Sequence, residues 1–310
     1  MTEETNKPRN HLIVDASAEF VFKYRQYGNV KTIVVQQTPD EITWPGGALW
    51  DIGILLAKLM VMVNSAPQPS TKVSNNKEDI INVPRARLPD MWPISWKDCT
   101  ILELGCGVGL TGLVGAALGA KLTILTDLDV VIEKVTKKNI ELNKNRFSKS
   151  QKVVASTLCW GNKDDEQACR RLLDEAKSKS SGTVGRKKKM KNKQQNDQKD
   201  HLSSSPIIPE TSDPSIILIG DVAYQHKPGA PSHFDILLST LLQFATTKKT
   251  LVLFGTRMRM PASADLLDMI KEHFDELIAP IDADEIDSTF AKSNLGRKSL
   301  ITLHFFKRKV

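Results

Sequence analysis

The spacing of apolar and polar positions changes near residue 99. Before it, two segments at 19–25 and 30–36 predict a β-hairpin, because Gly28 and Asn29 between them are turn-forming residues. An apolar stretch at 49–63 has the three-to-four-residue spacing of a helix. Residues 64–93 are rich in Pro, Ser and Asn, which predicts a loop.

From residue 99 onward, apolar strand-like segments alternate with helical ones. The pattern predicts strands at 100–104, 121–126, 153–158, 215–219, 250–255 and 298–306, and helices at 110–118, 129–143, 166–177, 234–245 and 262–274. Such alternation predicts an α/β fold, a doubly wound and mostly parallel sheet with helices on both faces. Because these sheets bind ligands beyond the carboxyl ends of their strands, the informative residues should lie directly after strands.

The charge of the chain is concentrated in one segment. The formal net charge is +7 over 310 residues, and the stretch 178–200, with eight Lys or Arg and two Asp, carries +6 of it. This stretch lies in the polar, low-complexity segment 178–213. This composition predicts disorder. The basic run at 186–193 has three possible roles: a nuclear localisation signal, an RNA contact or a solvated insertion. The rest of the chain is nearly neutral, so nucleic acid is not an expected partner of the fold itself.

Other classes are disfavoured by what the sequence lacks. Its four cysteines form no C-x-x-C pair, so neither a metal site nor a disulfide framework is expected. No apolar run reaches the roughly 18–20 residues that span a bilayer, and the polar first ten residues do not read as a signal peptide. The expected location is cytoplasmic, and also nuclear if the basic run is an import signal.

A glycine-rich loop follows the first strand of the alternating region. Gly105, Gly107 and Gly109 lie where this strand passes into a helix. Glycine lets the backbone approach a ligand where a Cβ would clash. Residues 107–112 fit the dinucleotide fingerprint G-x-G-x-x-G, but the loop fits a methyl-donor site equally well, and the glycines could also be purely structural. Asp127 would hold a ribose hydroxyl with either ligand.

Glu103 distinguishes the two ligands. It lies at the end of the strand, two residues before the first glycine. A carboxylate there would repel the pyrophosphate of a dinucleotide, whereas it would attract the ammonium and sulfonium of S-adenosyl-L-methionine. A structural alternative is that Glu103 caps the N–H groups of the following turn. The sequence therefore favours S-adenosyl-L-methionine as the cofactor.

With Glu103, the three glycines and Asp127 in place, the chain resembles the seven-β-strand, class I methyltransferases. Four further segments occur in order: Leu-Trp-Asp at 49–51, Leu-Cys-Trp-Gly at 158–161, Gly-Asp-Val-Ala-Tyr at 220–224 and Thr-Arg-Met-Arg at 256–259. Together they resemble the protein-lysine methyltransferases that modify chaperones and translation factors. The resemblance runs from about residue 19 to the C-terminus, interrupted at 64–93 and 178–213. It implies an N-terminal hairpin, helix and loop extension at 1–98 and a methyltransferase domain at 99–310.

The resemblance also implies roles for individual residues. Asp221 and Tyr224 would form the catalytic, substrate-lysine end of the pocket. The family usually has Gly-Ala-Asp before this Tyr, whereas this chain has Ile219-Gly220-Asp221. Each aromatic residue could instead be core packing, and Asp221 could cap a helix. The implied cofactor-binding residues are Trp50, Glu103, Gly105, Cys106, Gly107, Gly109, Asp127, Trp160 and Gly220.

Alternative functions remain open at this point. The same fold could methylate a protein histidine, an RNA or a small molecule, or act as a binding module without activity. The Asn/Asp-Pro-Pro-Tyr signature of enzymes that methylate planar nitrogens is absent, which disfavours nucleic-acid and glutamine substrates. An NAD-dependent oxidoreductase is the runner-up, but the second half has no Tyr-x-x-x-Lys pair to support it. We expect a protein substrate, nucleic-acid contact only through the basic insertion, and no membrane association.

Overall fold

The computed structural model describes residues 19–26, 29–38, 45–64, 88–93, 95–181, 212–222, 233–258, 261–290 and 301–309. Within these residues the large sheet has eight strands, seven of them in the order β5-β4-β3-β6-β7-β10-β8, with β9 paired to β10. The strands are β3 (Thr100–Leu104), β4 (Leu122–Asp127), β5 (Lys152–Thr157), β6 (Ile216–Gly220), β7 (Leu251–Arg257), β8 (Phe274–Glu276), β9 (Ile281–Asp282) and β10 (Ile301–Arg308).

The five strands from β5 to β7 run parallel, and β10 is antiparallel to β7, β8 and β9. This confirms the predicted α/β class with a mostly parallel sheet. The order reverses at β3, whose neighbours β4 and β6 lie on its two sides. Ligands of doubly wound sheets bind at such a switch point, beyond the carboxyl ends of the strands.

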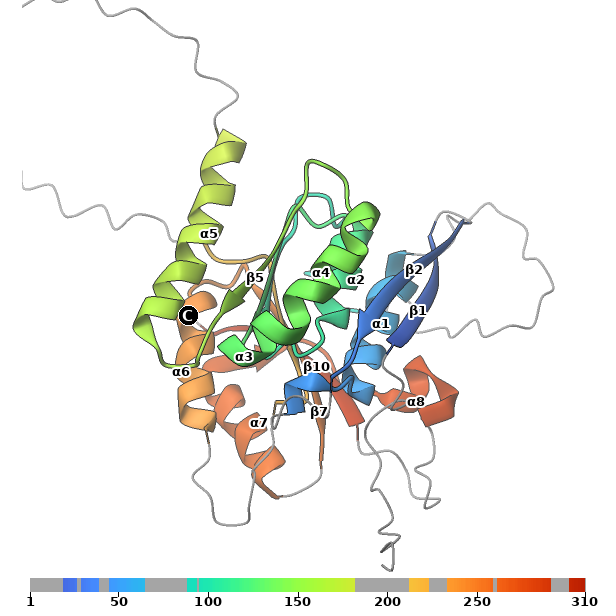
Figure 1. Ribbon diagram of the computed structural model, residues 1–310. Coiled ribbons are helices and arrows are strands. Elements are labelled where there is room, and N and C mark those ends of the chain that lie inside the picture. Colours follow the sequence, from blue (N-terminus) through green and yellow to red (C-terminus); the bar gives the residue numbers. More distant parts are fainter. Residues whose placement is uncertain are drawn as a thin grey trace, which may run out of the picture.

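Helices cover both faces of the sheet (Figure 1). On one face lie α1 (Asp51–Asn64), α2 (Leu110–Leu118) and α4 (Lys137–Asn143), and on the other lie α5 (Lys163–Ser181), α6 (Phe234–Phe244) and α7 (Pro261–His273). Because strand residues alternate between faces, Ile101 and Leu218 join the first core and Leu102 and Ile217 the second. The short α8 (Ala283–Ile286) follows β9.

The predicted helix at 129–143 contains a π-helical turn. It begins as α3 (Asp129–Val131), widens at Ile132–Thr136 and ends as α4. A π turn inserts extra backbone into a helix and changes which side chains face inward. Thr136 and Asn139 are both fully buried, although each is polar. Their partners lie in the glycine-rich loop, as described below.

The N-terminal hairpin forms a sheet of its own and packs onto the first core. Strands β1 (Glu19–Gln26) and β2 (Asn29–Gln36) pair antiparallel, as the sequence predicts. Phe22 and Ile33 on its inner face join the same hydrophobic cluster as α1 and α2. Figure 1 shows β2 beside α4. The hairpin thus reaches the helix that follows β4.

Most of the loop predicted at 64–93 lies outside the described residues, but its end is anchored. Trp92 is 2% exposed and packs edge-on against Trp96 and Phe305, with ring centroids 5.8 Å apart in both pairs. The chain returning to β3 is therefore fixed to the core by aromatic packing.

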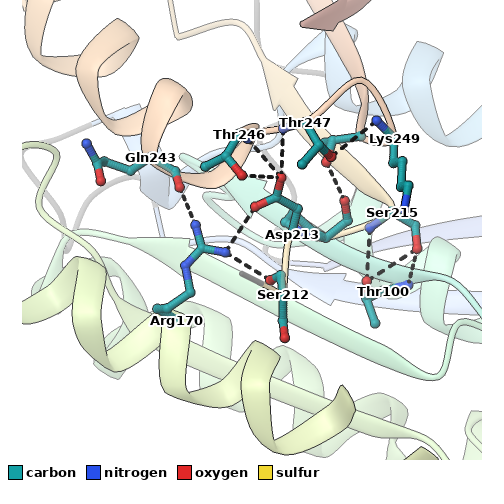
Figure 2. Close-up of polar contacts among 11 residues, drawn as sticks. Thr100, Arg170, Ser212, Asp213, Ser215, Gln243, Thr246, Thr247 and Lys249 are labelled. Carbon is teal, nitrogen blue, oxygen red and sulfur yellow. Dashed lines mark hydrogen bonds and ion pairs between the residues drawn. The ribbon is translucent and has the colours of Figure 1, made fainter. Parts of the chain in front are cut away.

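The segment predicted as disordered, 178–213, is structured at both of its ends. Helix α5 continues to Ser181. At the other end Asp213 Oδ2 accepts hydrogen bonds from Thr246 N and Oγ1, both at 2.8 Å, and from Thr247 N at 3.0 Å (Figure 2). Residues 182–211, with the basic run, lie outside the described residues.

Arg170 of α5 completes this cluster at the amino edge of the sheet. Its Nη1 lies 3.2 Å from Asp213 Oδ1 and donates to Ser212 O at 2.9 Å, and Nη2 donates to Gln243 O (Figure 2). Its guanidinium carbon lies 5.0 Å from the centre of the Phe244 ring. The point where the chain re-enters the sheet is therefore fixed by charge, hydrogen bonds and packing together.

Among the described residues, no helix has both the length and the apolar character needed to cross a bilayer. Within the same residues, no group of three or more His, Cys, Asp or Glu side chains has an arrangement suited to a metal ion.

Candidate active site

A cavity of about 440 Å³ lies at the carboxyl edge of the sheet. Its walls come from the segments that follow β3, β4, β5 and β6 and from the start of α1, so it occupies the switch point. Its size is typical of small-molecule sites. Nine of the eleven residues predicted for the site line it: Trp50, Glu103, Gly105, Cys106, Gly107, Asp127, Trp160, Gly220 and Asp221.

The glycine-rich loop has a backbone that only glycine adopts easily. Gly105, Gly107 and Gly109 have φ values of 70°, 52° and 82°. A Cβ on Gly107 would lie 3.2 Å from Gly46 O, because the segment before α1 passes directly over the loop. Gly109 does not line the cavity but precedes the first residue of α2, where its φ turns the chain into the helix.

Asp127, the last residue of β4, ties the loop to the sheet. Its Oδ2 accepts a hydrogen bond from Gly107 N and its Oδ1 one from Leu128 N, both at 2.8 Å. Burial raises the pKa of the Asp127 carboxyl above its usual range. Each carboxylate oxygen has a second lone pair, so the group can accept further hydrogen bonds from a ligand.

Glu103 faces the cavity and also caps α2. Its Oε2 accepts a hydrogen bond from Gly112 N at 2.9 Å, and the residue is 4% exposed. Burial raises the pKa of the Glu103 carboxyl to about 8, and the nearby Asp127 adds to the rise. Glu103 therefore both caps the N–H of Gly112 near the start of α2 and lines the cavity. A buried and a half-buried acid in one cavity favour a cationic ligand over a phosphate.

Two tryptophans form apolar walls. Trp50 precedes α1, and its Nε1 donates to Pro45 O at 2.9 Å, which fixes the ring beside the segment above the glycine loop. Trp160 follows β5, and its ring packs against Gly105, where an added Cβ would lie 3.5 Å from Cζ2. Both rings line the cavity, and Trp160 also packs against the second core cluster.

Asp221 stands at the end of β6 in a strained conformation. Its φ of 54° is the one positive value among the non-glycine residues that the structure describes. The left-handed region is costly for residues other than glycine, although Asp tolerates it better than most. Asp221 N donates to Gly255 O at 3.0 Å, and the residue lines the cavity. Tyr224, the other predicted catalytic residue, lies outside the described residues.

Several residues of the site carry no recognisable sequence signal. His233 and Ile236, at the start of α6, line the cavity although no motif marks them. Arg257, in the Thr-Arg-Met-Arg segment, forms an ion pair with Asp51, and their side chains are 20% and 19% exposed. The pair joins the carboxyl end of β7 to the first residue of α1. Arg259 lies outside the described residues.

Comparison with known proteins agrees with these features. A family model described as lysine methyltransferase matches residues 31–174. Protein N-lysine methyltransferase METTL21A of Mus musculus is 40% identical over 72 residues, which cover 23% of this chain and 32% of that protein. The same enzyme of Xenopus tropicalis is 25% identical over 181 residues, or 58% of this chain and 60% of its own length.

A third relative is the ribosomal protein L11 methyltransferase of Ruminiclostridium cellulolyticum, 42% identical over 62 residues, which cover 20% of each chain. The matched segments therefore span between a fifth and three fifths of these relatives' own lengths. The matches confirm the resemblance to lysine methyltransferases that the motifs indicate.

Proposed function

We propose, from the likeness to lysine methyltransferases over residues 31–174, that this chain transfers a methyl group from S-adenosyl-L-methionine to a lysine amine of a protein substrate. One observation carries the cofactor assignment: a buried carboxylate, Glu103, and a half-buried one, Asp127, face a cavity whose other walls include two tryptophans. Burial disfavours the charged form of both acids and raises the pKa of each carboxyl. A cationic ligand between apolar walls offsets this cost.

The residues of the cavity fit this cofactor. Glu103 would attract the cationic groups of the methyl donor, and Asp127 would accept hydrogen bonds from its ribose. Gly105 and Gly107 let the backbone approach closely, and the rings of Trp50 and Trp160 offer flat apolar surfaces. Cys106 and Gly220 complete the lining.

The chemistry requires a neutral amine and good positioning. S-adenosyl-L-methionine supplies an electrophilic methyl group, and as the amine lone pair forms the C–N bond, the C–S bond breaks with its electrons left on sulfur. Lysine has a reference pKa of about 10.4, so partial desolvation in the pocket favours the neutral form, and water takes the proton before attack. Asp221 would attract the incoming ammonium and then accept a hydrogen bond from the amine. Tyr224 would orient the amine. Positioning supplies much of the rate.

Other chemistries have less support. A dinucleotide would place its pyrophosphate beside Glu103, whose carboxylate disfavours it. Histidine, RNA or small-molecule substrates for the same fold have no observation here in their favour. Chaperones or translation factors are the substrate class that the motif resemblance suggests. A cytoplasmic location, with nuclear access through the basic run at 186–193, completes the proposal.

Calorimetric titration with S-adenosylhomocysteine, with NAD as the control ligand, tests the cofactor. We expect S-adenosylhomocysteine alone to bind, and Asp127→Ala to abolish binding because it removes both the ribose acceptor and the anchor of Gly107. Binding of NAD alone would overturn the proposal. Incubation with labelled S-adenosyl-L-methionine and cell extract, followed by mass spectrometry of labelled proteins, then tests lysine as the acceptor.

A further inference from the structure

Two asparagines of α4 bond to the outer edge of β2. Asn139 Oδ1 accepts from Gln36 N at 2.8 Å, and its Nδ2 donates to Gln36 O at 3.0 Å. One helical turn later, Asn143 Oδ1 accepts from Val34 N at 3.0 Å, and its Nδ2 donates to Val34 O at 2.6 Å. Each carboxamide thus bonds to β2 in the way that a peptide group of a third strand would.

The spacing of the helix and the strand makes this pairing possible. A helix advances roughly 6 Å over four residues, and a strand roughly 6.8 Å over two. Asn139 and Asn143 therefore meet alternate residues of β2, whose N–H and C=O groups point away from β1. Both asparagines are at most 1% exposed, so their bonds are made away from water. Figure 1 shows the resulting contact between β2 and α4.

The two asparagines differ in their second amide hydrogen. Asn143 Nδ2 also donates to Asn139 O at 2.7 Å, a contact within its own helix. Asn139 Nδ2 instead donates to Val108 O at 2.9 Å. Val108 lies between Gly107 and Gly109 in the glycine-rich loop and lines the cavity. Only Asn139 therefore connects the hairpin to the loop.

The helical segment at 129–143 also binds the carbonyl of Gly107, the residue before Val108 in the loop. Thr136 Oγ1 donates to Gly107 O at 2.9 Å. Two consecutive loop carbonyls are thus bound by side chains of the helix, while Asp127 binds Gly107 N from the sheet. Residues three apart lie on one face of a helix, so Thr136 and Asn139 face the loop together.

We infer that Asn139 is a positioning residue, which couples docking of the N-terminal hairpin to the conformation of the glycine-rich loop and thereby to cofactor affinity. The inference rests on the proposed function for its link to the cofactor. A ligand that binds only one loop conformation loses affinity in proportion to the population of that conformation. Loss of the Asn139 amide leaves Val108 O without its donor and the loop with one fewer restraint.

The test compares Asn139→Ala with the matched control Asn143→Ala. Each removes two bonds to β2, so similar losses of melting temperature are expected, but only Asn139→Ala removes the loop contact. Hydrogen exchange of backbone amides at 105–112 should be about tenfold faster in Asn139→Ala, and the Kd for S-adenosylhomocysteine about tenfold higher. In Asn143→Ala both should stay within about twofold of the unchanged protein. Equal effects of the two variants on the loop, or no effect of either, would overturn the inference.

Failure of the proposed function gives a different result. If the unchanged protein does not bind S-adenosylhomocysteine, the cofactor assignment fails, and hydrogen exchange of the loop alone decides the role of Asn139. Should Asn139→Ala not fold at 10 °C, a temperature chosen for the assay at roughly the usual stability maximum, the pair Asn139→Ser and Asn143→Ser replaces it. Serine leaves a hydroxyl for nearby backbone groups, and the same contrast in loop exchange is expected.

Discussion

Glu103 Oε2 accepts a hydrogen bond from Gly112 N at 2.9 Å, so one carboxylate both caps α2 and faces the proposed cofactor. The bond links the cavity to the packing of the helix that follows the glycine-rich loop. Both roles depend on the protonation state of this acid, and its pKa of about 8 places the change near neutral pH.

We predict that affinity for S-adenosyl-L-methionine rises with pH up to about 8. Below that value Glu103 is mostly protonated in the free protein, and a cationic ligand must first displace the proton. Affinity should therefore fall by up to about tenfold per pH unit below 8 and level off above it. Titration calorimetry at several pH values measures this.

Glu103→Gln is the control for this pH dependence. It keeps an oxygen for Gly112 N but has no charge, so its weaker binding should hardly change with pH between 6 and 9, a range set around the pKa of about 8. A flat profile in the unchanged protein would contradict the assignment. For folding the sign is opposite: because the pKa is raised, Glu103 stabilises the free protein at low pH, and this contribution is lost as pH rises through about 8.

Asp221 gives a prediction that separates charge from backbone strain. Asp221→Ala should abolish methyl transfer and leave S-adenosylhomocysteine binding largely intact. Asp221→Asn should do the same, because Asn tolerates the φ of 54° but is uncharged. Asp221→Gly should also be inactive, yet about 1 kcal/mol more stable than Asp221→Ala in urea unfolding, since glycine adopts this φ without strain. Turnover in any of the three would rule out the catalytic role.

The amino-edge cluster should stabilise the fold without affecting the cavity. Asp213 accepts bonds from Arg170, Thr246 and Thr247, and its side chain is 7% exposed. Asp213→Ala should cost about 3 kcal/mol, because it leaves these half-buried donors, one of them a guanidinium, without their acceptor. Urea unfolding measures the loss.

Glu175→Ala is the matched control for Asp213. Glu175 also forms an ion pair, with Lys152, but the two side chains are 57% and 40% exposed. An exposed pair contributes little, so the expected loss is below about 1 kcal/mol. Equal losses of stability in the two variants would show that the cluster contributes no more than an exposed ion pair does.

Two helical glycines should respond to alanine in opposite directions. A Cβ on Gly112 in α2 would lie 2.1 Å from Leu125 Cδ2 and 2.7 Å from Glu103 Oε2, so Gly112→Ala should destabilise by about 2 kcal/mol. In α1, a Cβ on Gly53 would have no contact shorter than 3.6 Å. Gly53→Ala should therefore gain up to about 1 kcal/mol from helix propensity. Thermal unfolding of both variants distinguishes packing from propensity.

The sequence predicts the five parallel strands well, together with the motifs that follow them, and the reason is physical. Buried strands such as β3 and β6 are continuous apolar runs, and ligand-facing residues must follow them at the carboxyl edge. Glu103 and Asp127 follow from this pattern and Asp221 from the motif resemblance, and all three line the cavity. The very short strands β8 and β9 are missed, because two or three residues carry no periodicity.

Contacts between distant segments could not be predicted in the same way. The ion pair of Asp51 with Arg257 and the bonds of Asn139 to Gln36 join residues more than 100 positions apart. A polar residue in a helix reads as surface unless its neighbours in space are known. The buried Asn139 and Asn143 are the clearest case, since their partner is the edge of another sheet.

The cluster around Asp213 and the cavity lie at opposite edges of the sheet. Both described ends of the insertion, α5 near Ala176 and the segment at Ser212, lie at the amino edge of the sheet, since Lys121 before β4 donates to Ala176 O and Arg170 to Ser212 O. The cavity opens at the carboxyl edge. A reporter or affinity tag placed within 182–211 would therefore join the fold at the edge farthest from the reacting end, which makes this segment the natural position for labelling the protein.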